Sequence, residues 1–316
     1  MIILAPLQGY TDFIFRNVYN RHYTGIDIAV SPFISLVHGE KGIPRIARDV
    51  LPENNHSMPV IPQILGNSPK HFIKMAEFIY KWGYKQINWN MGCPVKNVTR
   101  KKRGSGLLPF PELVREILEK VIPNIPQSLS VKIRLGLNKT DEIYQLIPVL
   151  NDFPLDNIII HPRIGNQMYE GDIYHDVLKK CLPLIKHEII YNGDIFSLAD
   201  YQEIKNKYPT IKKWMIGRGV FYNPLLPAFI KGTPVPIVEK NDEHFLSFLL
   251  DLYKELQIFI NNDRVIFKIK DLWKLFSKRF SEPDKVFNKI AHANTMEEIT
   301  RITKMIIKEE EIIETI

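Results

Sequence analysis

Eight short apolar runs, most of them rich in β-branched residues, recur along the first 216 residues with helix-compatible stretches between them. They are residues 2–7, 26–33, 60–65, 86–91, 129–135, 157–161, 188–191 and 213–216. None alternates cleanly between apolar and polar residues, which is typical of strands buried on both faces. This order predicts an α/β fold, a (β/α)8 TIM barrel. A doubly wound parallel sheet is the alternative, but eight repeats favour the closed barrel.

Amphipathic stretches between these runs supply the helices that such a barrel needs. Residues 69–80 carry an apolar stripe, with Ser68 placed as an N-cap and Pro69 at the first helical position. Residues 111–121 and 143–150 have the same character. Each of these stretches is therefore expected to cover the outside of the barrel.

The βα pattern stops at the Pro- and Gly-containing stretch 231–236, which we interpret as a linker. Beyond it, residues 244–260, 264–279 and 295–308 show the apolar stripes of amphipathic helices. The sequence thus predicts two domains: residues 1–235 form a catalytic barrel, and residues 236–316 form a small helical domain.

The composition excludes several classes of protein. Two cysteines among 316 residues rule out a disulfide framework and a Cys-rich zinc site, and no metal is expected. The first residues lack the basic segment of a signal peptide, and no apolar run reaches the ~20 residues of a membrane span. We expect a cytoplasmic protein without membrane contact. Its net charge of +7 suits a polyanionic partner, although many enzymes with neutral substrates are as basic.

Nearly every predicted strand ends in a polar residue or a Gly/Pro cluster. Catalytic residues of TIM barrels lie at this carboxyl end of the strands. The clusters are Pro6-Leu7-Gln8-Gly9, Gln63, Asn90 to Pro94, Lys132 with Arg134, His161, Asn192-Gly193-Asp194 and Gly217-Arg218-Gly219. Such a series is difficult to explain by packing alone, so the sequence predicts an active site there.

The last two clusters lie where barrels commonly bind phosphate, after strands seven and eight. Glycines allow backbone N–H groups to approach a phosphate, and Arg218 adds a charged donor. Two glycine turns between strand and helix would explain the glycines but not the arginine.

Three further side chains are candidates for chemistry. Cys93 follows a buried strand and is either a buried free cysteine or a reactive thiol. Lys132 and Arg134 alternate along one strand and so face the barrel interior together. Such cations need a partner, either a cofactor that develops negative charge or a buried carboxylate. His161 alone would be a core histidine, and Cys181 is expected in the core.

A run of basic residues follows Cys93 closely. It contains Lys96, Arg100, Lys101, Lys102 and Arg103, with no acidic residue from Met91 to Phe110. A solvated loop is the ordinary explanation, but the position suits an RNA backbone beside a reacting base. The tail adds Arg264, Lys268, Lys270, Lys274, Lys278 and Arg279. Trp273 and Phe276 are expected in the core rather than as base-stacking surfaces.

Taken together, the motifs resemble the ordered signature of the tRNA-dihydrouridine synthases. They are APLQGYTDFIFR, PQILGNSP, INWNMGCP, SVKIRLG, IIHPRIGNQMYEG, IIYNGDI and MIGRGVFYNP. The tail RVIFKIKDLWKLFSKRFSEPDKVFNKI is similar to the bacterial C-type subgroup, which acts on position 16 of the tRNA D-loop.

This resemblance implies an FMN enzyme with NADPH as reductant, in which hydride passes from flavin N5 to C6 of a flipped-out uracil. It makes Cys93 the proton donor to C5, which fits a thiol that is mostly protonated at neutral pH. It assigns the flavin to Pro6, Leu7, Gln8, Gln63, Lys132, His161, Asn192, Gly193, Asp194, Gly217 and Arg218. It assigns uracil to Asn90 and Arg134, with Tyr169 near the mouth of the site, and tRNA to the basic loop and the helical domain.

The sequence departs from the family pattern at three places. Leu7 stands where methionine is usual, His161-Pro162-Arg163-Ile164 replaces an HGRT-like segment, and Asn88 stands where aspartate is common. None of these changes removes Cys93, Lys132 or the phosphate motifs, so an active enzyme is expected.

Two other functions remain open from the sequence. Another FMN barrel oxidoreductase acting on a small molecule, such as a dihydroorotate dehydrogenase, would share Lys132 and the phosphate motifs but would not need the basic loop. A tRNA-binding protein that aids RNA folding would not need Cys93. A monomer is expected in each case.

Overall fold

A computed structural model describes residues 1–35, 47–235, 242–260 and 262–313, and for residues 262 and 263 it describes only the backbone. Pro236, at the end of the expected linker, and the start of the expected helical domain lie outside the described residues.

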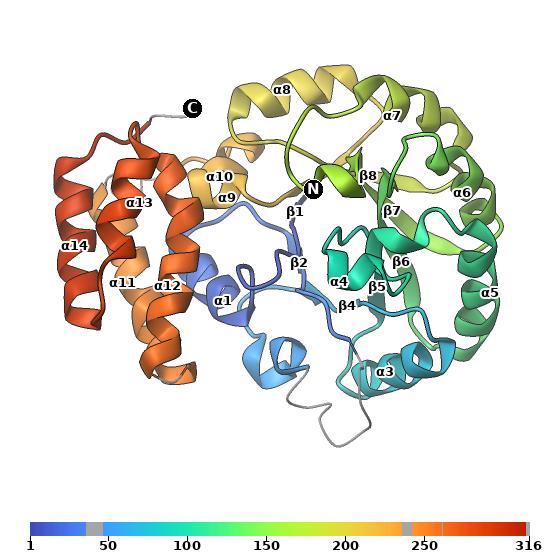
Figure 1. Cartoon of the computed structure of the whole chain (residues 1–316), viewed down its shortest axis with the longest axis horizontal. Helices are drawn as coiled ribbons and strands as arrows, with labels where there is room; N and C mark the ends of the chain where they lie inside the picture. Colours follow the sequence, from blue (N-terminus) through green and yellow to red (C-terminus); the bar gives the residue numbers. More distant parts are fainter. Residues whose placement is uncertain (36–46, 236–241, 261, 314–316) are drawn as a thin grey trace.

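The strands form one parallel sheet in the order β3-β2-β1-β9-β8-β7-β6-β5-β4. Their bounds are β1 (Ile2–Leu4), β2 (Ile28–Val30), β3 (Val60–Ile61), β4 (Gln63–Ile64), β5 (Gln86–Met91), β6 (Ser128–Gly136), β7 (Leu155–Ile164), β8 (Glu188–Asn192) and β9 (Lys213–Ile216). Because β3 and β4 are consecutive segments of chain, the sheet closes on itself as a barrel (Figure 1). The TIM barrel is therefore confirmed.

Prolines explain some of the differences between the observed strands and the expected runs, although β7 continues through Pro162 beyond the expected residues 157–161. The expected strand 60–65 is two strands because Pro62 has no N–H and interrupts the ladder, while its carbonyl still accepts from Asn88 N at 2.9 Å. The first two strands end at Leu4 and Val30, earlier than expected, shortly before Pro6 and Pro32. The chain is thus free to leave the barrel at its carboxyl end.

Helices surround the barrel (Figure 1). They are α1 (Phe13–His22), α3 (Pro69–Lys81), α5 (Pro111–Val121), α6 (Glu142–Asn151), α7 (His175–Cys181) and α8 (Leu198–Lys207), with the short α4 (Lys96–Thr99), α9 (Gly219–Tyr222) and α10 (Leu226–Lys231). The expected cap is confirmed, since the Ser68 hydroxyl accepts from His71 N. Cys181 ends α7 and is buried, as expected.

Single turns of 3-10 helix join several of these elements. They are η2 (Arg48–Val50), η3 (Pro52–Asn54), η4 (Gly104–Leu107), η5 (Ile122–Asn124), η6 (Gly165–Gln167), η7 (Leu182–Leu184) and η9 (Ser277–Arg279).

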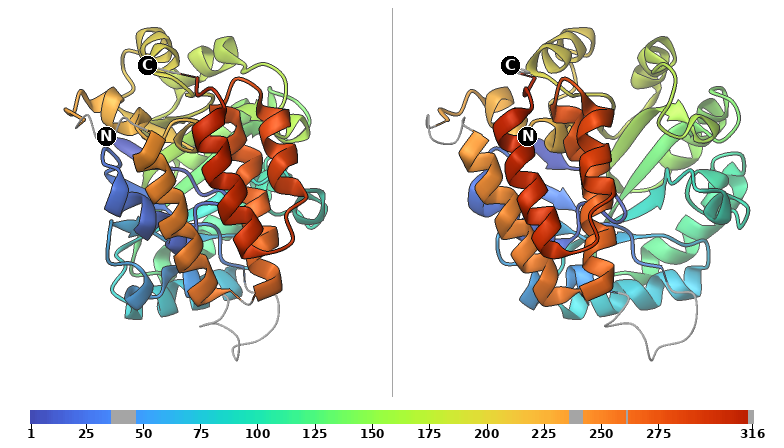
Figure 2. Two further views of the ribbon diagram at one scale, coloured as in Figure 1. Left: turned by 90° about the vertical axis from the view of Figure 1, so that its left-hand side faces the viewer. Right: turned by 60° about the vertical axis from the view of Figure 1, so that its left-hand side comes forward.

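The tail folds as four helices that lie side by side against one flank of the barrel (Figure 2). They are α11 (Asp242–Phe259), α12 (Asn262–Phe276), α13 (Pro283–Ala291) and α14 (Met296–Glu309). The sequence analysis did not identify α13, although Pro283 stands at its start. Trp273 and Phe276 are buried, as expected.

Aromatic contacts join the tail to the barrel. Phe15 of α1 contacts Phe248 of α11 with ring centroids 6.2 Å apart, and Phe221 contacts Phe276 at 5.3 Å. Lys268 of α12 adds an ion pair to Asp12 at 2.6 Å. Buried residues of both parts belong to one hydrophobic cluster. The tail is therefore positioned firmly beside the carboxyl end of β1, and its independence as a domain stays a prediction.

Candidate active site

A cavity of about 540 Å³ opens at the carboxyl end of the barrel. Most of the predicted site residues line it, and they come from the ends of β1, β5, β6, β7, β8 and β9. They are Pro6, Leu7, Gln8, Asn90, Cys93, Lys132, Arg134, His161, Tyr169, Asn192, Gly193, Asp194, Gly217 and Arg218. Residues far apart in the sequence thus meet in one place, as parallel strands require.

Lys132 and Arg134 both reach this cavity from β6, as their alternation predicts. Arg134 is buried and donates to the carbonyls of Gly92 at 3.1 Å and Ile164 at 2.9 Å. Lys132 is half-buried, and within the described part of the chain its ammonium donates no hydrogen bond. Neither cation pairs with a carboxylate among the described residues, so the ion-pair explanation fails.

This isolation lowers the affinity of the Lys132 side chain for its proton. Burial, with a smaller contribution from the Arg134 charge, lowers the pKa of Lys132 to about 7. Burial also lowers the pKa of Arg134 to about 10, which leaves it charged at neutral pH. Arg134 therefore stays charged in the cavity, whereas the charge of Lys132 responds to what binds beside it.

His161 is buried at the edge of the same cavity. Burial, followed by the charges of Arg134, Lys132, Arg163 and Arg218, lowers the pKa of His161 well below its usual value. The imidazole is therefore neutral at physiological pH. Its Nε2 lies 3.3 Å from Nη1 of Arg163.

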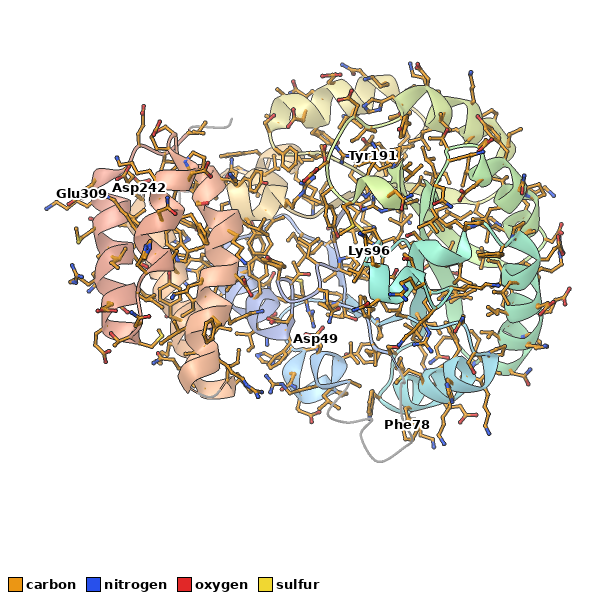
Figure 3. The ribbon with its side chains drawn as sticks, viewed as in Figure 1. Asp49, Phe78, Lys96, Tyr191, Asp242 and Glu309 are labelled. Carbon is orange, nitrogen blue, oxygen red and sulfur yellow. The ribbon has the colours of Figure 1, made fainter. Side chains whose placement is uncertain are left out.

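The turns after β8 and β9 form the wall that the glycine motifs predict. A Cβ on Gly193 would lie 2.6 Å from the hydroxyl of Tyr191, which Figure 3 labels, and a Cβ on Gly219 would lie 2.1 Å from the Ile195 carbonyl. Glycine is therefore required at both positions. Across the described chain, the backbone N–H groups of residues 193, 194, 217, 218 and 219 donate to no protein acceptor. They are available to an anionic group in the cavity.

Asp194 sits between two arginines at this wall. Its Oδ1 accepts from Arg218 Nη2 at 2.7 Å and from Arg163 Nη1 at 2.8 Å, and its Oδ2 accepts from Arg163 Nη2 at 2.5 Å. The sequence analysis noted Arg163 only as part of a departure from the family motif. The spacing that pairs Lys132 with Arg134 also relates Arg163 to His161 and would have identified it.

The Cys93 loop is held by hydrogen bonds on both sides of the thiol. Asn90 Oδ1 accepts from the backbone N–H groups of Gly92 at 3.1 Å and Cys93 at 2.9 Å. The Cys93 carbonyl accepts from the N–H of Ser105 at 3.0 Å and from its hydroxyl at 3.1 Å. A Cβ on Gly104 would lie 2.5 Å from the same carbonyl. The thiol thus has a fixed position.

Cys93 is half-buried and lines the cavity, which favours the reactive over the purely structural interpretation. Burial raises the pKa of its thiol, although the charges of Arg134 and Lys132 oppose this shift. The thiol therefore stays protonated at neutral pH and can donate a proton rather than attack as a thiolate.

Gln63, which the resemblance assigns to the flavin, is held by a chain of amide hydrogen bonds. It is buried and is not among the residues that line the cavity, so its contact with a flavin stays a prediction. Its Nε2 donates to Asn88 at 2.8 Å and its Oε1 accepts from Asn90 at 2.7 Å. Asn88 in turn donates to Ser130 at 2.8 Å. This buried chain of amides fixes Asn90, and through it the Cys93 loop.

Tyr169 stands at the mouth of the cavity and is 45% exposed. The guanidinium carbons of Arg134 and Arg218 each lie 5.4 Å from its ring centroid, and its ring stacks on His161 at 6.5 Å. Tyr169 therefore lies near the mouth of the cavity, and its aromatic ring is accessible to a flat ligand.

The predicted basic residues do not line the cavity. Lys96 starts α4, beside the barrel opening in Figure 3, and Arg100 and Lys101 are exposed. Lys102 lies over the Phe110 ring at 4.2 Å, and Arg103 donates from Nε to Asn67 at 3.2 Å. In the tail, Lys268 donates to the Gly9 carbonyl at 2.6 Å, and Arg279 lies over the Phe245 ring. Several of these cations therefore make contacts within the protein that stabilise the fold.

Other lining residues were not identified from the sequence. They are Ala5, Tyr10, Phe33, Val95, Val98, Ile195, Phe196 and Leu275. Leu275 comes from α12, so the tail contributes directly to the cavity. No local pattern marks Leu275, because its position depends on how α12 packs against the barrel.

No helix among the described residues is both long and apolar enough to cross a membrane. No group of three or more His, Cys, Asp or Glu side chains among them could hold a metal ion.

Comparison with known proteins gives one consistent family. The family described as dihydrouridine synthase (Dus) matches residues 3–311. The chain is 33% identical over 228 residues to tRNA-dihydrouridine synthase B of Pasteurella multocida, covering 71% of this chain and 67% of the relative. It is 33% identical over 263 residues to a probable tRNA-dihydrouridine synthase of Staphylococcus aureus, covering 80% and 75%. Neither name carries the C-type designation that the tail motif predicts.

A solved structure resembles the fold at much lower identity. The old yellow enzyme homologue of Zymomonas mobilis aligns with a TM-score of 0.50 and 11% identity, covering 75% of this chain and 91% of that one. This likeness supports the barrel architecture alone.

Proposed function

The chain belongs to the dihydrouridine synthase family, and we propose that it reduces a uridine of tRNA to 5,6-dihydrouridine. The observation that carries this proposal is a protonated thiol, Cys93, that faces a cavity containing Lys132, a cation with no carboxylate partner among the described residues. A double-bond reduction needs both a proton donor and a site for an electron-rich cofactor.

The hydrogen-bond donors and cations of the cavity fit FMN as the cofactor, with NADPH as the reductant. Arg218 would hold the FMN phosphate together with the backbone N–H groups of residues 193, 194 and 217–219, which donate to no acceptor among the described residues. Lys132 would stabilise the negative charge of the reduced ring, and Pro6, Leu7, Gln8, His161 and Asn192 would line the flavin. When bound, the reduced flavin supplies a hydride to C6 of the uracil.

Asp194 has a different role from direct phosphate binding in this proposal. A carboxylate repels a phosphate, and Asp194 already accepts from Arg163 and Arg218. It orients Arg218 toward the cavity and balances its charge. Gln63, which is buried and accepts from Asn90, would act on the flavin site through that residue.

Cys93 would donate its proton to C5 of the uracil during reduction of the C5=C6 bond. The S–H bond and the C5=C6 π bond break, a C–H bond forms at C5, and the thiolate regains its proton from solvent. A thiol with a raised pKa is a weak nucleophile but remains fully protonated, so it suits this role.

The residues around the Cys93 thiol would recognise the uracil. Arg134 is fixed by two backbone carbonyls and has further donor capacity toward a uracil oxygen. Tyr169 offers a ring at the cavity mouth, and Asn90 lies beside Cys93. The base must leave its stack to reach them, which favours a flexible loop of RNA over a helix.

The basic loop of Lys96 and Arg100 to Arg103, with the tail helices, would contact the tRNA backbone. The net charge of +7 supports this assignment. By the resemblance of the tail we propose position 16 of the D-loop as the target, and a monomeric, cytoplasmic enzyme.

Mass spectrometry of unmodified tRNA tests the proposal. The tRNA is incubated with the protein, FMN and NADPH, and nuclease fragments are weighed. A gain of two hydrogens on one D-loop uridine is expected, and position 16 would support the subgroup assignment. A bound flavin without any gain would favour a small-molecule oxidoreductase, and neither flavin nor gain would favour a tRNA-binding protein.

A further inference from the structure

Arg163 lies behind the cavity wall rather than in it. It is 3% exposed and is absent from the lining residues, yet its guanidinium contacts three parts of the site. It reaches Asp194 after β8, the carbonyl of Gly171 beyond Tyr169, and His161 on its own strand. No function assigned above uses this residue.

The contact with Gly171 controls the segment that carries Tyr169. Arg163 donates to the Gly171 carbonyl from Nε at 3.1 Å and from Nη2 at 2.6 Å. The segment is strained, since Met168 has a φ of 54°, a conformation that side chains other than glycine rarely adopt. Strain of this kind persists only where surrounding contacts enforce it. The paired donation from Arg163 is such a contact.

The contact with Asp194 links the same guanidinium to the phosphate wall. Arg163 reaches both carboxylate oxygens, while Arg218 shares only Oδ1. If an anionic ligand draws Arg218 into the cavity, Asp194 keeps its pairing with Arg163. A buried arginine with both partners satisfied is held in one orientation.

The contact with His161 fixes a tautomer. Arginine has only donors, so Nε2 of His161 must accept from Nη1 of Arg163, and the ring proton is on Nδ1. The neutral imidazole thus has a fixed donor nitrogen, whatever ligand enters the cavity.

We propose that Arg163 is a positioning residue that holds Tyr169, Asp194 and His161 in one arrangement, so that the cofactor wall and the substrate mouth form together. The proposal rests on the function proposed above for its kinetic consequence. Its structural consequence, order in residues 165–174, does not depend on that function.

Three variants test it: Arg163→Gln, Arg163→Lys and the control Arg115→Gln, which breaks an exposed ion pair between Arg115 of α5 and Asp152 at the end of α6. Hydrogen exchange of residues 165–174 is measured on the protein alone. FMN affinity is measured by fluorescence, and kcat and KM are measured with tRNA.

Arg163→Gln should accelerate exchange of this segment and weaken FMN about tenfold, since charge-assisted hydrogen bonds are lost. It should raise KM for tRNA more than it lowers kcat. Arg163→Lys keeps the charge beside Asp194 but cannot bridge to Gly171, so it should restore FMN affinity without restoring slow exchange. Arg115→Gln should change none of these values.

Unchanged exchange and FMN affinity in Arg163→Gln would overturn the proposal, as would equal changes in Arg115→Gln. If Arg163→Gln does not fold, Arg163→Lys decides, because wild-type exchange in that variant would overturn the role at Gly171. Absence of tRNA reduction by the wild-type protein would refute the proposed function, while the exchange result would still support or overturn the positioning role.

Discussion

Two groups of cations lie near the carboxyl end of this barrel, and they differ in how their positions are determined. Arg134, Arg163 and Arg218 contact the cavity wall through specific hydrogen bonds, and Lys132 stands among them with no hydrogen bond from its ammonium to any residue that the structure describes. Arg100 and Lys101, in contrast, are exposed at the rim.

The difference shows which charged residues are informative about function. An exposed cation costs little free energy, so its presence says little about a specific partner. A cation removed from water is unfavourable unless something compensates it. Lys132 lacks that compensation within the described chain, and so it points to a ligand more strongly than the whole basic loop does.

Removing the thiol should produce the largest effect while leaving both groups of cations intact. We expect Cys93→Ala to lower turnover by about two to four orders of magnitude, the usual contribution of a general acid. Flavin binding and tRNA binding should persist. Single-turnover reduction of tRNA, with the visible flavin spectrum, measures both.

Cys181→Ala is the matched control, because this second thiol is buried away from the cavity. It should retain turnover although it costs some stability. Flavin loss in Cys93→Ala would argue against the proton-donor role.

Replacing Lys132 should weaken flavin binding without lowering the stability of the fold. Lys132→Met should weaken FMN about tenfold to a hundredfold, because a charge-assisted contact is lost. The midpoint of thermal unfolding should stay the same or rise, since a poorly compensated charge leaves the interior. Fluorescence titration and thermal unfolding without flavin test the two parts.

The exposed Lys179 of α7 provides the control for this change. Lys179→Met should alter neither quantity. Equal FMN affinity in wild type and Lys132→Met would remove the main evidence for the cation's role.

The charge of Lys132 should also make flavin affinity depend on pH. Its pKa in the free protein is about 7, and an anionic ligand beside it raises that pKa. The complex therefore holds the proton that the free protein loses above pH 7. FMN affinity should be greatest below pH 7 and fall by up to about tenfold per pH unit above it, until the pKa of the complex is reached.

Titrations between pH 7 and 9 measure this slope, and Lys132→Met controls for titration of the flavin itself. A wild-type slope equal to that of the variant would contradict the assignment.

Changes to the exposed residues Arg100 and Lys101 should have the smallest effect. The double variant Arg100→Gln and Lys101→Gln should weaken tRNA binding by a few fold and reduce its salt dependence by about one unit of log–log slope per lost phosphate contact. FMN affinity should not change. Filter binding at several salt concentrations provides the slope.

Lys179→Gln with Lys180→Gln removes the same charge from α7, on the outside of the barrel, and should leave tRNA binding unchanged. An equal loss from this pair would mean that total charge, rather than the position of the loop, determines binding.

Periodicity and strand-end chemistry predict much of this site because both are local. Lys132 and Arg134 are two residues apart on one strand, so their shared direction follows from backbone geometry alone. The glycines at 193 and 219 mark close approaches that only glycine permits. Parallel strands then bring these ends together without further information.

What the sequence missed depends on contacts between distant segments. The hydrogen bonds of Gln63 to Asn88 and Asn90 join two neighbouring strands, and no local pattern in the sequence predicted them. Leu275 reaches the site only because α12 packs beside β1, where Lys268 pairs with Asp12. Such placements follow from tertiary packing and have no signature of their own.

The pairing of Ser105 with the Cys93 carbonyl has a consequence for redesign. A loop that changes length freely offers a protein engineer a way to alter substrate choice without disturbing the reaction. This one does not, because any insertion between residues 93 and 105 would shift the peptide that carries the thiol. Efforts to retarget the enzyme would begin instead with exposed positions of α12 such as Phe267 and Lys274, where sequence can vary while the thiol stays in place.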